Sequence, residues 1–181
     1  FDKYLGMNFF NVAAGGTPLI YENIFWFYSH PAVYVIFLPA VGLIFEMAAT
    51  FAKNKIFNYK GTVYVGIWGT VLLSGVVWGH HLYVSAIPDW LVMVLTFTTL
   101  LISVPVGILV IGLFGTLYKG SIEYKTPMLY VAGFIFLFLI GGLTGIPNAM
   151  SSIYVHIHGT YWIPGQFHYV MAVSPTTAVL G

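Results

Sequence analysis

The sequence predicts an all-α protein, a bundle of about five transmembrane helices. Hydrophobic residues make up 59% of the 181 residues and charged residues only 6%, whereas roughly a quarter of a soluble domain is charged. About 20 apolar residues are needed to cross roughly 30 Å of hydrocarbon. Stretches of that length occupy residues 23–51, 62–87, 90–118, 127–150 and 161–181. No repeat or linker marks a second domain, so we expect one transmembrane domain over residues 1–181.

Composition excludes several function classes. The chain has six lysines, no arginine and a net charge of +1, so it offers no basic patch for nucleic acid. It has no cysteine, which excludes disulfides and thiolate metal sites within the chain. Phe1 does not start a signal peptide, and we expect the chain to be an internal piece of a longer protein.

The lysines predict the orientation in the membrane. Five of the six lie in the loops after the first and third spans, and those loops share one side. Short loops rich in lysine face the cytoplasm. This orientation brings four histidines to one depth, near the outer ends of their spans. They are His30, His80, His81 and His168.

Histidines at that depth predict a metal site. Ionisable side chains are costly inside a membrane and are usually functional, and neutral imidazole is a common ligand of copper and zinc. His30 and Tyr34 are four residues apart and share a helix face. Neighbouring residues of a helix point about 100° apart, so His80 and His81 can share a metal only if the backbone is distorted, which Gly79 eases. A hydrogen bond to a neighbouring helix would explain a single histidine at this depth. It explains three histidines at one depth less well.

Several blocks of the sequence resemble subunit I of the heme–copper respiratory oxidases, the catalytic subunit of cytochrome c and quinol oxidases. The resemblance covers essentially the whole chain, and the blocks follow the order found in the middle of that subunit, roughly its sixth to tenth of twelve helices. The blocks include His30-Pro-Ala-Val-Tyr34, Trp78-Gly-His-His81, Thr126-Pro-Met-Leu129, Gly141-Gly-Leu-Thr-Gly145 and Phe167-His-Tyr-Val170.

The resemblance implies roles for particular residues. The three ligands of the copper ion match His30, His80 and His81, and the tyrosine that supplies a proton and an electron matches Tyr34. An axial ligand of the low-spin heme matches His168, and a histidine near the heme propionates and a magnesium site matches His158. Tyr28 and Ser29 resemble the proton-path pair of one branch of the family, in which Ala32 takes the place of a glutamate.

The resemblance also implies an activity and its setting. We expect a proton-translocating terminal oxidase that reduces dioxygen to water with two hemes and copper. The implied partners are other oxidase subunits including subunit II, membrane lipid, and cytochrome c, a copper protein or quinol as electron donor. The expected location is a prokaryotic cell membrane rather than the mitochondrial inner membrane.

Three departures from the family pattern keep other functions open. Gln166 stands where the family has the ligand of the oxygen-binding heme, although we expect it to face that heme. Leu109 and Phe45 replace the lysine and serine of a proton route, with Glu46 as an alternative entry, and Gly159 replaces an aspartate of the magnesium site. The alternatives are a divergent homologue with impaired or absent dioxygen reduction and a nitric oxide reductase, which Tyr34 and Ala32 disfavour; a heme-free transporter is more distant.

Overall fold

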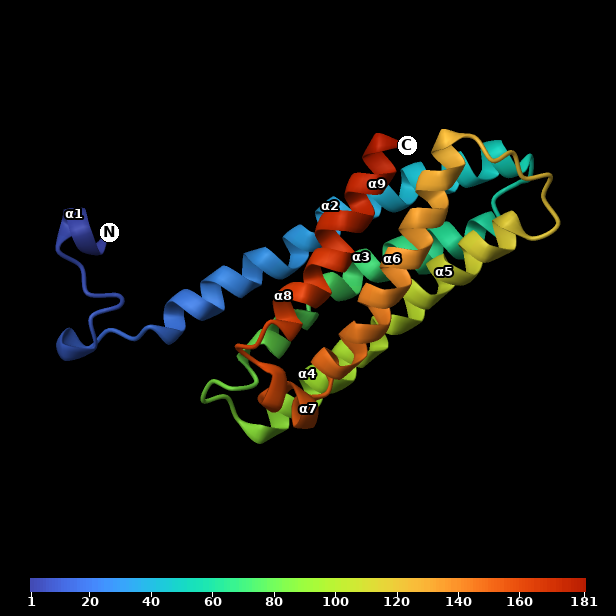
Figure 1. The fold of residues 1–181 in the computed structure, drawn as a ribbon. Helices are drawn as coiled ribbons and strands as arrows, with labels where there is room; N and C mark the ends of the chain where they lie inside the picture. The colour runs from blue at the N-terminus through green and yellow to red at the C-terminus, as the bar shows by residue number, and fades with distance from the viewer.

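The fold is a bundle of helices with no strand, as the sequence predicts. The computed structural model describes residues 1–181. Helical rods pack side by side, and a short N-terminal segment lies apart from them (Figure 1). That segment contains α1 (Asp2–Leu5) and the 3-10 turn η1 (Val12–Ala14).

Three predicted spans are confirmed as helices long and apolar enough to cross a membrane. The first is α2 (Leu19–Ala52), the third is α4 (Asp89–Leu101) continued by α5 (Ser103–Leu117), and the fourth is α6 (Thr126–Ala149). At 1.5 Å per residue, the 34 residues of α2 span about 51 Å, more than the hydrocarbon thickness. The N-terminal turns of α2 extend beyond the other helices of the bundle (Figure 1).

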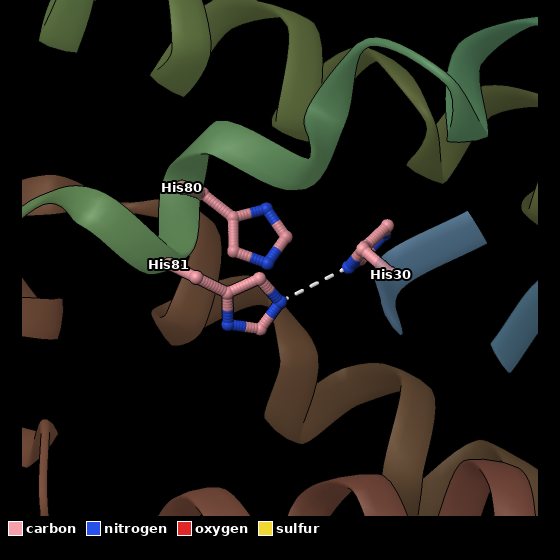
Figure 2. Close-up of side chains that lie close together, drawn as sticks. All are labelled: His30, His80 and His81. Carbon is pink, nitrogen blue, oxygen red and sulfur yellow. Dashed lines mark hydrogen bonds between the residues drawn. The ribbon is translucent and has the colours of Figure 1, made fainter. Parts of the chain in front are cut away.

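The second predicted span is not one continuous helix. A π-helical segment, η2 (Gly61–Ile67), leads into α3 (Trp68–Ser74), and the chain then turns and forms the 3-10 segment η3 (Val77–Leu82). The hydroxyls of Ser74 and Ser85 donate to backbone carbonyls three residues earlier, which competes with regular helix. Gly79 also packs tightly here, since a Cβ would lie 2.7 Å from Leu95 of α4. The pair His80 and His81 therefore lies on a distorted backbone (Figure 2).

The fifth predicted span is helical but less apolar than the three long ones. It consists of α8 (Trp162–Phe167), the π-helical η4 (His168–Val173) and α9 (Ser174–Leu180). Polar Gln166 and His168 lie in its first half. A short helix, α7 (Ser151–Ile157), forms in the uncharged segment between α6 and α8.

The main core lies between α2, α5, α6 and α9. Phe37 of α2 stacks on Phe138 of α6, with ring centroids 4.8 Å apart. Ile44 and Val131 are fully buried beside them. Large apolar side chains such as Leu72 and Phe136 are exposed on the outer faces, as expected for helices that meet lipid or further helices.

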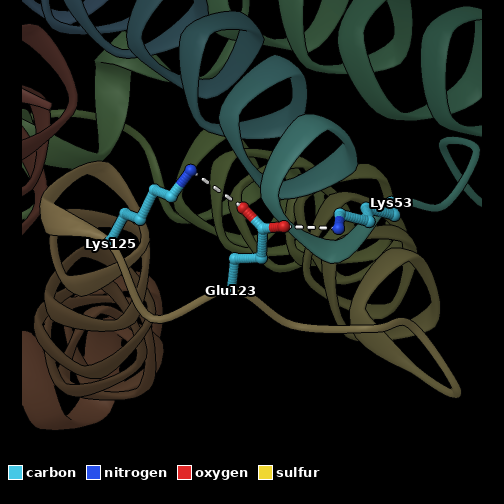
Figure 3. A network of polar contacts seen from close by, with 3 residues as sticks. All are labelled: Lys53, Glu123 and Lys125. Carbon is cyan, nitrogen blue, oxygen red and sulfur yellow. Dashed lines mark ion pairs between the residues drawn. The ribbon is translucent and has the colours of Figure 1, made fainter.

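Two loops are joined at the lysine-rich end of the bundle. The Glu123 backbone N–H donates to the Phe51 carbonyl at 2.8 Å. The Glu123 carboxylate contacts the Lys53 ammonium, and its other oxygen lies 3.1 Å from Lys125 Nζ (Figure 3). These contacts tie the end of α2 to the start of α6 and confirm that the first and third loops share one side.

The Glu123 ion pairs predict a pH-dependent contribution to stability. Hydrogen bonds from Lys53 and Lys125, together with their charges, hold the pKa of Glu123 below its usual value. A carboxylate with a lowered pKa stabilises the fold above its ordinary pKa, and the contribution disappears as pH falls through the lowered value. Thermal unfolding in detergent should therefore show a lower midpoint for Glu123→Gln at neutral pH, and no difference in strong acid.

The same difference should shrink at high salt, because these groups are exposed to solvent and screened. Glu22→Gln is the control, since Glu22 makes no ion pair. A deficit of equal size at all pH values would show that Glu123 acts through packing and not through charge.

Candidate metal centre

Three imidazoles from two separate segments meet in the structure. His30 comes from α2, and His80 and His81 come from η3. One ring nitrogen from each lies within 4.8 Å of the other two. Figure 2 shows the three rings turned toward one another, with His30 Nδ1 3.1 Å from His81 Nε2. These three of the four histidines expected at one depth are brought together.

A threonine on α4 orients His80. The ring is only 7% exposed, and its Nδ1 lies 3.2 Å from Thr99 Oγ1. When Nδ1–H donates to this hydroxyl, the lone pair of the ring is left on Nε2. Such a hydrogen bond fixes both the tautomer and the orientation of a metal-binding histidine.

Aromatic rings from α2 hold the other side of the cluster. Trp26 stacks on His81, with ring centroids 3.5 Å apart and planes within 4°. Tyr34 lies one turn from His30, with centroids 5.1 Å apart. The expected pairing of Tyr34 with the first histidine on one helix face is therefore present.

The cluster fits a metal ion by its chemistry. His30 Nε2 is buried and has no hydrogen-bond partner in the protein, and an unpaired buried polar atom requires an explanation. No carboxylate joins the group, so the donor set is three neutral imidazoles. Imidazole suits copper or zinc, whereas magnesium and calcium prefer oxygen ligands.

His168 lies outside this cluster. It begins η4, its ring is exposed, and its Nδ1–H donates to the Pro164 carbonyl at 2.6 Å. This hydrogen bond leaves Nε2 available. The arrangement fits a ligand for a group that lies against the outer face of the fifth span.

Gln166 does not fit as an iron ligand. Its Nε2 donates to the Gly141 carbonyl at 3.2 Å, and its Oε1 accepts from Asn148 Nδ2 at 3.2 Å. Both ends of the amide are therefore engaged with α6. The expectation that this side chain faces a heme is not supported by its contacts.

The remaining predicted residues are dispersed around the cluster. His158 Nδ1 pairs with the Tyr154 hydroxyl at 3.0 Å. Gly159 follows with a φ of 71°, which favours glycine. No cluster of acidic residues accompanies His158 within this chain, and magnesium prefers oxygen ligands. Tyr28 is exposed and Ser29 half-buried, and neither hydroxyl is hydrogen-bonded within the chain.

The positions of the lysine proton route lie in the apolar core. Phe45 and Leu109 are 4% and 3% exposed. They line a pocket with ten other residues, all of them hydrophobic. Glu46, which the sequence suggests as an alternative proton entry, is exposed on α2. The core between α2 and α5 therefore contains no group that can relay a proton at these positions.

Sequence reasoning missed Thr99, Trp26 and Asn148. Trp26 is four residues before His30, so helical spacing could have found it. Thr99 and Asn148 carry no such signal, because their partners lie on other helices.

Known proteins resemble the chain over nearly its full length. The family model described as cytochrome c and quinol oxidase polypeptide I matches residues 1–181. Cytochrome c oxidase subunit 1 from Synechocystis is 43% identical over 94% of the chain and 31% of that relative. The subunits named alike from Cereibacter sphaeroides and Candida albicans are 42% and 41% identical over 96% of the chain and 30% and 32% of their own lengths. The chain thus spans about a third of the length of these relatives.

The Thr99 contact predicts a test of metal affinity. Thr99→Val removes the partner of His80 Nδ1 at nearly constant volume and should weaken metal binding by roughly 10- to 100-fold, the usual effect of losing such a partner. Competition with a chelator of known affinity measures it in the complete protein. Thr98→Val is the control, because the Thr98 hydroxyl bonds only to carbonyls of its own helix. Equal affinities for Thr99→Val and the parent would contradict this role.

Proposed function

Because this chain belongs to the cytochrome c and quinol oxidase polypeptide I family, we propose that it forms the copper-binding part of the catalytic subunit of a terminal respiratory oxidase. In the complete protein, this subunit reduces dioxygen to water. The copper ligands are His30, His80 and His81. The observation that carries the proposal is the convergence of these three imidazoles, with one ring nitrogen of each within 4.8 Å of the other two.

When bound, copper and a heme iron supply electrons and a binding place for dioxygen. The chain holds the copper with imidazoles whose tautomers are fixed, as Thr99 fixes that of His80. Packing around η3 excludes water: Leu82 and Tyr83 are buried, and Tyr83 donates to the Ala149 carbonyl at 3.2 Å. The protein thus supplies ligation and a dry site, while the metals carry the redox chemistry.

Tyr34 is the proposed source of a proton and an electron. Its ring lies beside His30 on the same helix, which brings the phenol to the metal ligands. His168 is the proposed ligand of a low-spin heme, supported by its anchored Nδ1 and outward position. Protons reach Tyr34 by a path other than Leu109 and Phe45, with Tyr28 and Ser29 as the proposed alternative.

The setting of the function follows from the family. The chain is part of an integral membrane protein, with three helices long enough to span a bilayer. We propose that the complete subunit works with subunit II and further subunits, and takes electrons from cytochrome c, a copper protein or quinol. A prokaryotic cell membrane is the proposed location. Similar subunits occur in both bacteria and a yeast.

The contacts of Gln166 favour a second candidate function. A divergent oxidase homologue with impaired dioxygen reduction retains the copper ligands and the helix bundle but lacks a ligand for the oxygen-binding heme. The engaged amide of Gln166 and the apolar Leu109 are the features that support this candidate. Oxygen consumption by the complete protein separates the two candidates.

Tyr34→Phe tests the proposed chemistry. The variant should keep its copper but lose dioxygen reduction by about 100-fold or more, since a positioned proton donor typically contributes that much. An oxygen electrode with a reduced donor measures the rate, and elemental analysis measures copper. Tyr64→Phe is the control, because Tyr64 is exposed on η2. Undiminished oxygen consumption in Tyr34→Phe would refute its role, and a copper-free parent protein would refute the copper site.

A further inference from the structure

Gln166 takes part in a group of hydrogen bonds that join α8 to α6. Its amide bonds to Asn148 and to the Gly141 carbonyl. Asn148 Oδ1 in turn accepts from Trp162 Nε1 at 2.9 Å. Trp162 is one helical turn before Gln166, so the two side chains share the face of α8 that meets α6. Both amides are thus paired within the chain.

Glycines of α6 create the space for this set of contacts. A Cβ on Gly145 would lie 3.2 Å from Gln166 Nε2, and a Cβ on Gly141 would lie 2.7 Å from Val170 Cγ2. Small residues allow membrane helices to approach closely, and amide side chains then hydrogen-bond across the interface. The glycines of α6 and the amide side chain on α8 are therefore the residue types that this close contact requires.

The same contact fixes which way His168 faces. Residues two apart on a helix point about 200° from each other. With Gln166 turned toward α6, His168 is placed on the opposite, exposed face. A side chain at position 166 cannot engage α6 and also face a group on the His168 side.

We infer that Gln166 is a helix-bridging and positioning residue, and that the chain provides no iron ligand at this position. The inference rests on the proposed function only in that hemes accompany the copper site. The role of Gln166 is to orient His168 through the contact between α8 and α6. Any heme next to position 166 then takes its axial ligand from another source.

A double-mutant cycle in the complete, purified oxidase tests this inference. Gln166→Leu and Asn148→Leu each break the Asn148–Gln166 hydrogen bond, so each should lower the thermal midpoint. Each also loses one hydrogen bond of its own, so the double variant should lose more than either single variant but less than the sum of the two losses. Additive losses would overturn the bridge. Thr144→Val is a matched control on α6, because the Thr144 hydroxyl bonds only to carbonyls of its own helix, and its effect should add to that of Gln166→Leu.

Optical spectra supply a readout that stability alone does not. Both bridge variants should shift or broaden the low-spin heme bands to a similar degree, because both loosen the orientation of His168. Neither variant should remove a carbon-monoxide-sensitive heme signal that the parent shows. Loss of that signal in Gln166→Leu with retention in Asn148→Leu would identify Gln166 as an iron ligand and overturn the inference. If the purified protein holds no copper or consumes no oxygen, the proposed function is refuted. The double-mutant cycle still tests the bridge in that case, because it measures stability alone.

Discussion

Three imidazoles meet at one point in the structure, His80 buried and His30 and His81 half-buried, and the packing around them is organised to hold them there. A buried polar ring nitrogen needs a partner, and His30 Nε2 has none in the protein. Bringing His30 to His80 and His81 requires α2 to pack against η3 and requires η3 to leave regular helical geometry. A metal ion can pair with all three rings at once.

The neighbouring structure serves this arrangement in different ways. Thr99 fixes His80 by a hydrogen bond, and Trp26 fixes His81 by stacking. Gly79 allows η3 to lie against Leu95 of α4. Below the cluster, the Phe37–Phe138 stack and the residues around it form a core without polar groups at Phe45 and Leu109. The three histidines therefore form a polar site at one end of an apolar bundle.

Much of this architecture could be predicted from the sequence. Long apolar stretches predicted α2, α4–α5 and α6, because the cost of unpaired backbone in lipid leaves few alternatives to helix. The ionisable character of His30, His80 and His81 predicted their gathering. The end of regular helix after Ser74 was not predictable, because Val76 and Val77 fit an apolar helix and the deciding contact, Gly79 with Leu95, is long-range. The contacts of Gln166 were not predictable for the same reason, since Asn148 lies 18 residues away on another helix.

In the proposed site, His30, His80 and His81 bind one copper ion together. X-ray absorption at the copper edge of the complete protein tests this most directly. The spectrum should show three imidazole nitrogens at about 2.0 Å, close to the usual length of metal–imidazole bonds, and one of these scatterers should be lost in His81→Ala. A copper environment without three imidazoles, or one unchanged in His81→Ala, would contradict it.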